Sequence, residues 1–179
     1  MVFRARITAW PAIFITALVA VLASALMVPA AGLAQSNTII IGTTDNPSKL
    51  DPTDSYDFPG WWMASQTHEG LLRRDPFTGE LQPGLATEWS VSEDGLTYTF
   101  RLRRGVTFTD GAPFNAAAVK RHFERALQLN GDPVFLIGDI SRIDAIGDDQ
   151  VVIHLNNPDA TFLSKLAFTG PAYITSPNT

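Results

Sequence analysis

The sequence predicts a mixed α/β fold, and three local patterns carry that prediction. Residues 97–103 alternate between polar and apolar side chains, as a strand with one buried face does. Residues 116–127 form a helical pattern directly after Asn115, a favoured N-terminal cap. Residues 151–155 alternate again after a Gly-Asp-Asp turn. Short strands combined with an amphipathic helix therefore favour an α/β domain.

The elements before the first of these patterns are short. Residues 38–43 are apolar and rich in Ile, which predicts a buried first strand. Three prolines then prevent a long helix, and a helix is expected from Gly60 or Trp61 to Glu69. Residues 71–75 return as a strand, and a Pro-Phe-Thr-Gly turn follows it.

The stretch from Ala86 to Gly111 predicts a β-ribbon with a turn on either side of its alternating strand. Asp94-Gly95 precedes that strand and Asp110-Gly111 follows it. These pairs favour turns because Gly accepts a positive φ and Asp can bond its own backbone.

The remaining elements follow from the same rules. On the helix after Asn115, we expect an apolar inner face and a charged outer face. The inner residues are Ala118, Phe123, Ala126 and Leu127, and the outer ones are Lys120, Arg121, Glu124 and Arg125. Residues 140–146 predict a strand that pairs with 151–155. Asp159 is expected to cap a short helix ending at Leu166, and residues 171–176 predict a last strand.

The first 34 residues differ from the rest of the chain and predict a signal peptide. Arg4 and Arg6 precede an apolar run over residues 12–28, and small residues lead to Gln35 as the expected first residue of the mature protein. The alternative is an uncleaved N-terminal anchor, which needs about 20 apolar residues. Positive charge before the apolar run places the remainder of the chain outside the cytoplasm in either case.

Composition excludes several classes of partner. The chain of 179 residues carries a net charge of −5, and residues 1–34 hold two arginines and no acidic residue, so the remainder is more acidic still. Nucleic acids and anionic membranes bind cationic surfaces, so neither is expected as a partner. Cysteine is absent, which excludes disulfides and a lipid anchor on cysteine.

The ribbon and its flanks carry a set of residues at characteristic spacing. The ribbon residues are Ala86, Asp94, Thr97, Tyr98, Phe100, Leu102, Arg103, Gly105, Thr109, Asp110 and Gly111. The flanks are Leu50-Asp51-Pro52, the segment from His68 to Leu72, the segment from Pro83 to Trp89, and Pro113 to Ala116 with Val119-Lys120. Together these residues resemble the extracellular solute-binding proteins of ABC importers, family 5, which bind peptides, nickel and opines. The resemblance runs from about Thr38 to Pro177.

This resemblance implies the fold and the function. The fold would be part of a type II periplasmic-binding-protein fold, with residues 35–179 as the truncated N-terminal part of a family 5 domain: part of the first lobe and the adjoining subdomain. The protein would be a periplasmic subunit that captures a peptide or related small solute by closure of two lobes. It would then deliver the solute to a membrane permease powered by ATPases, and it would need no cofactor of its own. The alternative is a non-functional exported fragment of a truncated gene.

Four residues are predicted to contact the solute. In the family, the segment after Leu50-Asp51-Pro52 lines the cleft, so Tyr56 and Trp61 would offer flat apolar faces with one polar group each. Asp57, or Asp54, would meet an ammonium group of the solute. Phe135 follows the helix capped by Asn115, in a loop that can approach the cleft in relatives. The ordinary structural alternative is that these aromatic side chains belong to the core.

Other kinds of site find little support in the sequence. Arg101, Arg103 and Arg104 would fit phosphate or carboxylate recognition, but a solvated strand face paired with Glu88 or Glu93 is the preferred interpretation. The three histidines, His68, His122 and His154, lack metal-ligand spacing, so no metal is predicted. No nucleophile motif or phosphate-binding loop is present, which makes a secreted hydrolase a distant alternative.

Overall fold

The computed structural model describes residue 42, residues 44–168 and residues 170–179. The chain divides after Gly42, and every described helix and strand lies in the second unit, Thr43–Thr179. The predicted signal peptide and most of the predicted strand over residues 38–43 lie outside the described residues.

The second unit alternates short strands and helices, as the α/β prediction requires. The α-helices are α2 (Phe58–Thr67), α3 (Ala116–Leu129) and α4 (Phe162–Leu166), and η1 (Asp132–Leu136) and η2 (Gly170–Ala172) are short 3-10 helices. The strands are β1 (Leu72–Arg74), β2 (Leu81–Pro83), β3 (Ala86–Val91), β4 (Thr97–Leu102), β5 (Ile140–Ile146) and β6 (Gln150–Leu155).

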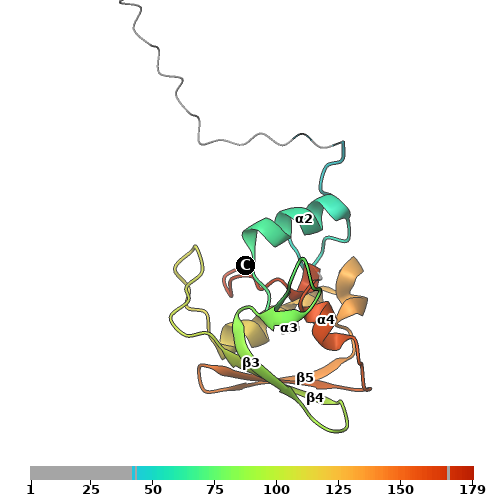
Figure 1. Ribbon diagram of the computed structural model, residues 1–179. Helices are drawn as coiled ribbons and strands as arrows, with labels where there is room; N and C mark the ends of the chain where they lie inside the picture. The colour runs from blue at the N-terminus through green and yellow to red at the C-terminus, as the bar shows by residue number, and fades with distance from the viewer. Residues whose placement is uncertain (1–41, 43, 169) are drawn as a thin grey trace, which may run out of the picture. The chain divides into compact units, whose positions relative to one another are not determined.

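Four of these strands form one antiparallel sheet in the order β3-β4-β6-β5 (Figure 1). The central strand β4 pairs with β3 on one side and with β6 on the other. Its alternation is confirmed, because Tyr98, Phe100 and Leu102 are buried while Arg101 is exposed. The turn before β4 is also as predicted, with Gly95 at a φ of 69°.

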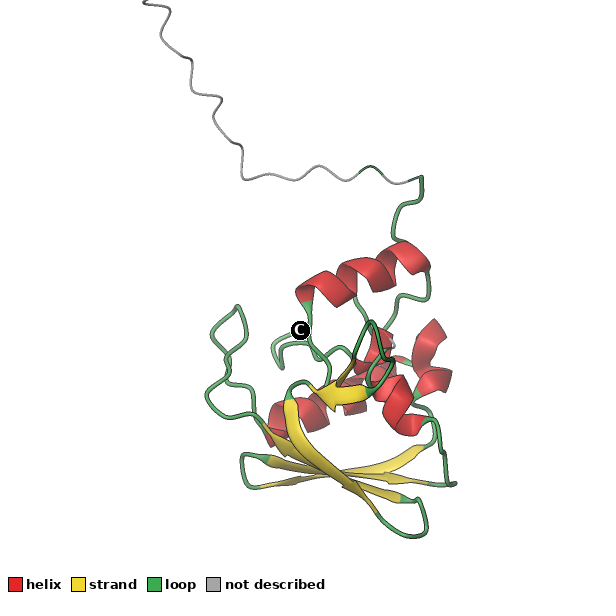
Figure 2. Cartoon of the chain, viewed as in Figure 1, coloured by secondary structure: helices red, strands yellow, loops and turns green. Residues whose placement is uncertain are grey.

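The helices lie on one side of this sheet (Figure 2). Helix α3 begins where the sequence predicts, since the Asn115 side chain accepts a hydrogen bond of 2.9 Å from the Ala118 backbone N–H. Its Val119 and Phe123 side chains are fully buried in the core that β4, β5 and β6 share. Burying one such side chain contributes about 1.5–3 kcal/mol, so the core between α3 and the sheet holds this scaffold together.

Two polar residues of α3 face inward, although the predicted inner face contains neither of them. His122, which the sequence leaves unassigned, is 2% exposed and points inward. The prediction of Arg125 on the outer face is wrong, because its side chain is largely buried against Asp51. Both residues use polar contacts with distant segments to satisfy their buried atoms.

The predicted last strand over residues 171–176 is wrong. Residues Gly170–Ala172 form the η2 turn, and a single bridge joins Tyr173 to Gly70. Pro171 has no backbone N–H to donate, and the Thr175 N–H donates to the His122 ring instead of to a strand. The segment is therefore fixed by the His122 side chain and by an isolated bridge, in which the Ile174 N–H donates to the Glu69 carbonyl at 3.0 Å, and not by a β-ladder.

The two other predicted helix boundaries shift by a few residues. Helix α2 begins at Phe58 because the Asp57 side chain caps it and Pro59 fits its first turn. Helix α4 begins only at Phe162, with Thr161 as the capping position. Asp159 does not cap that helix as predicted, because its carboxylate accepts hydrogen bonds from the backbone and hydroxyl of Thr161.

Candidate functional site

Three of the predicted solute contacts form one aromatic cluster, defined here as Tyr56, Trp61 and Phe135. The Tyr56 ring meets the Trp61 ring edge to face, with ring centroids 5.2 Å apart. It meets the Phe135 ring in the same way at 5.3 Å. Tyr56 is 49% exposed and Phe135 is 58% exposed, so neither ring is a core residue. The cluster presents an aromatic platform to solvent.

Two glycines allow the segments of this cluster to approach closely. A Cβ atom on Gly131, just before η1, would lie 2.5 Å from the Asp54 carboxylate. A Cβ atom on Gly170 would lie 2.7 Å from the Pro52 carbonyl oxygen and 2.8 Å from the Trp61 indole nitrogen. Such distances leave no room for a larger side chain. Close packing of η1 and η2 on the loop of residues 48–57 therefore positions Phe135 and Trp61 beside Tyr56.

The fourth predicted contact, Asp57, holds the loop that carries Tyr56. Its two carboxylate oxygens accept hydrogen bonds from the Gly60 N–H at 2.7 Å and the Ser48 N–H at 3.0 Å. The Ser48 hydroxyl and these backbone donors lower the pKa of Asp57, because they stabilise the ionised form. The Trp61 indole N–H donates to the Ser55 carbonyl at 3.0 Å and braces the same loop.

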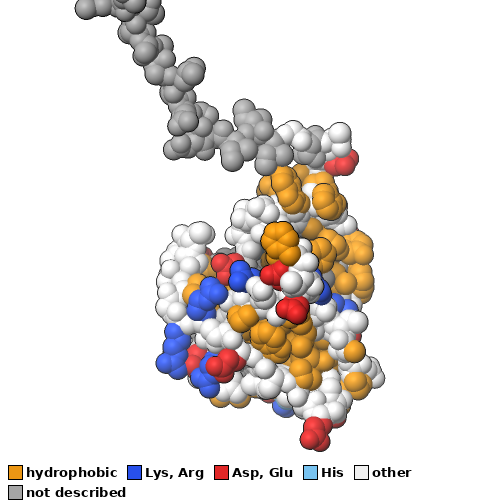
Figure 3. Space-filling model, in the orientation of Figure 1, with side chains coloured by type: hydrophobic (Ala, Val, Ile, Leu, Met, Phe, Trp, Pro, Cys, Tyr) orange, Lys and Arg blue, Asp and Glu red, His pale blue; other side chains and the backbone are white. Residues whose placement is uncertain are grey.

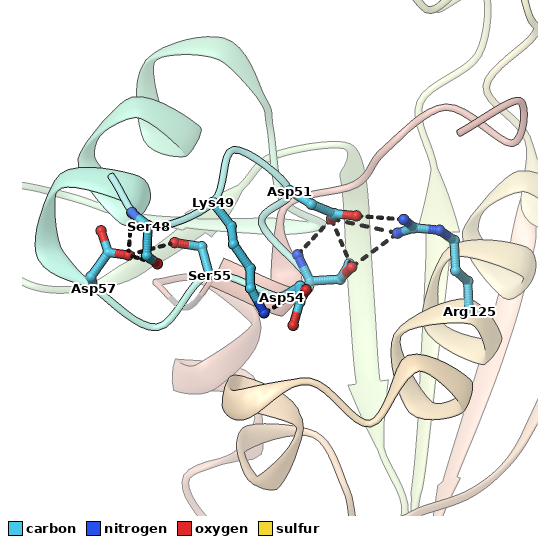
Figure 4. Close-up of polar contacts among 8 residues, drawn as sticks. Ser48, Lys49, Asp51, Asp54, Ser55, Asp57 and Arg125 are labelled. Carbon is cyan, nitrogen blue, oxygen red and sulfur yellow. Dashed lines mark hydrogen bonds and ion pairs between the residues drawn. The ribbon is translucent and has the colours of Figure 1, made fainter. Parts of the chain in front are cut away.

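An ion pair that no local sequence pattern predicts joins this loop to α3 (Figure 4). Arg125 forms a salt bridge with Asp51 and donates a hydrogen bond of 2.9 Å to the Thr53 hydroxyl. The Thr53 hydroxyl in turn donates to Asp51 at 2.7 Å. One signal was present, since Asp51 falls within a segment that carries the family resemblance, and Arg125 lies on the helix that begins in another.

The electrostatics of Asp51 match this arrangement. Burial, the largest single influence, would raise the pKa of Asp51, because it disfavours the charged form. Hydrogen bonds from Arg125 and Thr53 outweigh burial and lower the pKa to about 2. The Asp51 carboxylate therefore stays ionised at neutral pH, and its ion pair with Arg125 continues to join the loop of residues 48–57 to α3.

Asp54, the alternative to Asp57 as an ammonium contact, pairs with a residue of its own chain. The Lys49 ammonium lies 2.8 Å from its carboxylate, and Figure 4 shows the two side chains together. Asp54 retains 31% side-chain exposure, so it remains accessible from solvent.

The surface over α2 is apolar next to the aromatic cluster. Phe58 is 79% exposed, and Trp62 and Met63 are each about 40% exposed. Figure 3 shows hydrophobic side chains gathered over this helix. The apolar area beside Tyr56 and Trp61 therefore extends along α2.

The other sequence-derived candidates separate in the structure. Arg101 and Arg104 both pair with Asp149, whereas Arg103 points to Glu69, 3.5 Å away. Within the described residues, no group of three or more His, Cys, Asp or Glu side chains could hold a metal ion. The described part of the chain also has no helix that is long and apolar enough to cross a membrane.

Comparison with known proteins identifies the family. The model of the bacterial extracellular solute-binding proteins, family 5 Middle, matches residues 80–178, more than half of the chain. The chain belongs to this family. Its described α/β unit is part of the type II periplasmic-binding-protein fold, which the structural neighbours share.

Individual relatives agree with this assignment. The chain is similar to the glutathione-binding protein GsiB of Escherichia coli strain K12, with 36% identity over 159 residues, which cover 86% of this chain and 30% of the relative. A periplasmic oligopeptide-binding protein from Borrelia burgdorferi has a TM-score of 0.67 and 27% identity, covering 74% of this chain and 30% of that one. NikA from Brucella suis, solved in complex with Fe(III)-EDTA, has a TM-score of 0.66 and 30% identity, covering 74% and 27%.

These coverages also show how much of each relative the chain matches. The chain spans about 30% of the length of the curated relatives that it matches. The aromatic cluster therefore belongs to one part of a fold that is larger in its relatives.

Proposed function

We propose that this chain forms the N-terminal part of a periplasmic solute-binding subunit of an ABC importer. The convergence of Tyr56, Trp61 and Phe135 on one exposed platform carries the proposal. Membership of family 5 supports it, because the relatives are solute-binding transport proteins and not enzymes. The solute is a peptide or peptide-like molecule, in keeping with the glutathione-binding and oligopeptide-binding relatives.

The aromatic cluster binds the apolar parts of such a solute. Exposed rings that are held in place lose little side-chain entropy when they meet a ligand. Tyr56 adds a hydroxyl that can bond to a peptide group. Asp57 contributes by holding the Tyr56 loop, and direct contact with a solute ammonium is its alternative role.

Delivery of the solute requires partners outside this chain. A permease in the inner membrane, driven by ATPases, receives the solute after two lobes close around it. Residues 1–34 serve as the signal peptide that directs export. Mass spectrometry of protein recovered from the periplasm should find Gln35 at the N-terminus, and an intact residue 1 would refute cleavage at this point.

Calorimetric titration with glutathione and with mixed tripeptides tests the binding proposal on the 179-residue chain. We expect saturable binding of at least one of these solutes. Tyr56→Ala should weaken it about two- to tenfold, as loss of an aromatic contact does. Phe77→Ala is the matched control, since Phe77 is 96% exposed on the turn between β1 and β2. Absence of any saturable binding, or equal effects of the two substitutions, would contradict the proposal.

A further inference from the structure

A cavity that is rich in arginine lies at the other end of α2 from Trp61. Its volume is about 540 Å³, and the segments around it are the end of α2, β1, the loop before β3 and the region around η2. Three arginine residues line it, Arg73, Arg74 and Arg103. We call this cavity the arginine pocket. Sequence spacing groups Arg103 with Arg101 and Arg104, whereas the fold groups it with two residues of β1.

The positive charge of the arginine pocket is poorly neutralised. Arg74 donates to the Gly79 carbonyl at 2.6 Å, which is a neutral acceptor. Arg103 donates to the Gly84 carbonyl, and its other contact is with Glu69 at 3.5 Å. The Arg73 side chain has no hydrogen-bond or ion-pair partner among the described residues. Among the residues that the structure describes, the three arginine side chains thus have one carboxylate partner, that of Glu69, and most of their N–H donors are free to bind.

The backbone beneath these side chains is held firmly. Leu85 donates a hydrogen bond of 2.9 Å to the Gly70 carbonyl, and Ala86 donates one of 2.8 Å to Leu71. A Cβ atom on Gly84 would lie 2.6 Å from the Gly70 carbonyl oxygen, so the two segments touch at that point. The Gly84 carbonyl that receives Arg103 is therefore fixed relative to β1, which carries Arg73 and Arg74.

One further donor lines the pocket. The Tyr173 side chain lies at its edge, and its hydroxyl has no partner among the residues that the structure describes. Burial raises the pKa of Tyr173, because it disfavours the phenolate. The hydroxyl accordingly remains a hydrogen-bond donor at neutral pH.

We propose that the arginine pocket binds a small anion through a carboxylate or phosphate group. A guanidinium group binds either of these groups in a planar, two-point geometry, and the Arg73 side chain, which lines the pocket without a partner among the described residues, can provide it. The site is separate from the aromatic cluster. His68, which lines the pocket just after the end of α2, lies seven residues from Trp61, which corresponds to about 10 Å along the helix axis. The pocket stands out in a chain whose net charge is −5.

Titration of the 179-residue chain with inorganic phosphate and, separately, with succinate tests this proposal. Both titrations use a chloride-free buffer of constant ionic strength, with binding followed by calorimetry. We expect saturable binding of at least one probe, and the tighter probe distinguishes a phosphate site from a carboxylate site. Arg73→Gln should weaken that binding about tenfold, since it removes a charged donor without breaking a contact within the protein.

Arg142→Gln is the matched control, because it removes one positive charge from β5, outside the pocket. It should leave anion binding unchanged, as should Tyr56→Ala, which tests the solute site independently. No saturation with either probe would overturn the proposal. Equal weakening by Arg73→Gln and Arg142→Gln would also overturn it, because it would show a general charge effect.

Discussion

The α3-and-sheet layer and the loop of residues 48–57 are held in place by different kinds of force. In the layer, fully buried apolar side chains such as Phe100, Phe123 and Ile153 pack together. The loop instead relies on polar contacts, chiefly those of Asp51 with Arg125 and of Asp57 with Ser48. The apolar layer gives the scaffold its stability, and the polar loop sets the position of the aromatic cluster.

This difference has a consequence for function. Apolar packing is not directional, so a scaffold can tolerate changes in side chains that preserve volume. Hydrogen bonds and ion pairs fix direction, and a ring such as Tyr56 needs a fixed direction to meet a solute. Substitutions in the two regions should therefore separate stability from binding.

The largest effect is expected in the core of the layer. Phe100 is fully buried at the centre of β4, so Phe100→Ala removes a ring and leaves a cavity. The free energy of unfolding should fall by about 3–5 kcal/mol. Urea denaturation followed by circular dichroism measures this change. A loss below about 1 kcal/mol would show that the sheet is not the main source of stability.

The next effect concerns His122, the polar residue within the apolar layer. Its Nε2 lies 3.0 Å from the Pro171 carbonyl, and its Nδ1 accepts from the Thr175 N–H. Burial, the largest influence, lowers the pKa of His122 to about 4, although the Pro171 carbonyl acts in the opposite direction. The unfolded chain, with the ordinary histidine pKa of about 6.5, binds more protons between these two values.

Stability should therefore rise as the pH increases from about 4 to about 6.5, and it should be lost as the pH falls through this range. The full difference corresponds to about 3 kcal/mol. Denaturation midpoints across this range measure the slope, and His122→Gln should flatten it. The pKa of His68 is also lowered by burial, so a weaker slope of the same sign should persist in that variant. An unchanged slope in His122→Gln would contradict the assignment.

A smaller loss of stability is expected in the polar loop. Arg125→Ala leaves Asp51 without its ion pair, and the two side chains are 23% and 27% exposed, so solvent reduces the penalty. We expect a loss of about 1–2 kcal/mol. Hydrogen exchange over residues 51–57 should accelerate more than exchange in β4.

Lys120→Ala on the same helix is the control for this substitution, since its pair with Glu124 is exposed and should contribute little. If Arg125→Ala accelerates exchange in β4 as much as in the loop, then the two regions unfold together. The distinction between the layer and the loop would then fail.

Sequence patterns predicted the layer well and the contacts of the loop poorly, for a physical reason. The alternation in β4 and the Asn115 cap of α3 are local, so neighbouring residues suffice to predict them. The pairing of Arg125 with Asp51 joins residues 74 positions apart, and no local pattern contains it. The prediction of a last strand failed for the same reason. The Thr175 N–H donates to the ring of His122, which lies 53 positions earlier in the sequence.

The candidate site was predicted less well than the layer and better than the contacts of the loop. Resemblance to family 5 selected Tyr56, Trp61, Asp57 and Phe135 one by one. The structure brings the three aromatic rings among them together. The arginine pocket could not be predicted, since Arg103 comes 29 positions after Arg74 and only the fold brings both residues to one cavity. Contact of the aromatic cluster with a solute stays a prediction.

The double substitution Tyr56→Ala/Phe135→Ala tests most directly whether the aromatic cluster serves binding and not stability. Solute affinity and the urea midpoint are measured on the same preparation. We predict that the affinity for the solute bound by the unmodified chain falls by about tenfold or more, while the midpoint stays nearly unchanged, because both rings are about half exposed. Unchanged affinity together with a lowered midpoint would contradict this account and would make the cluster part of the scaffold.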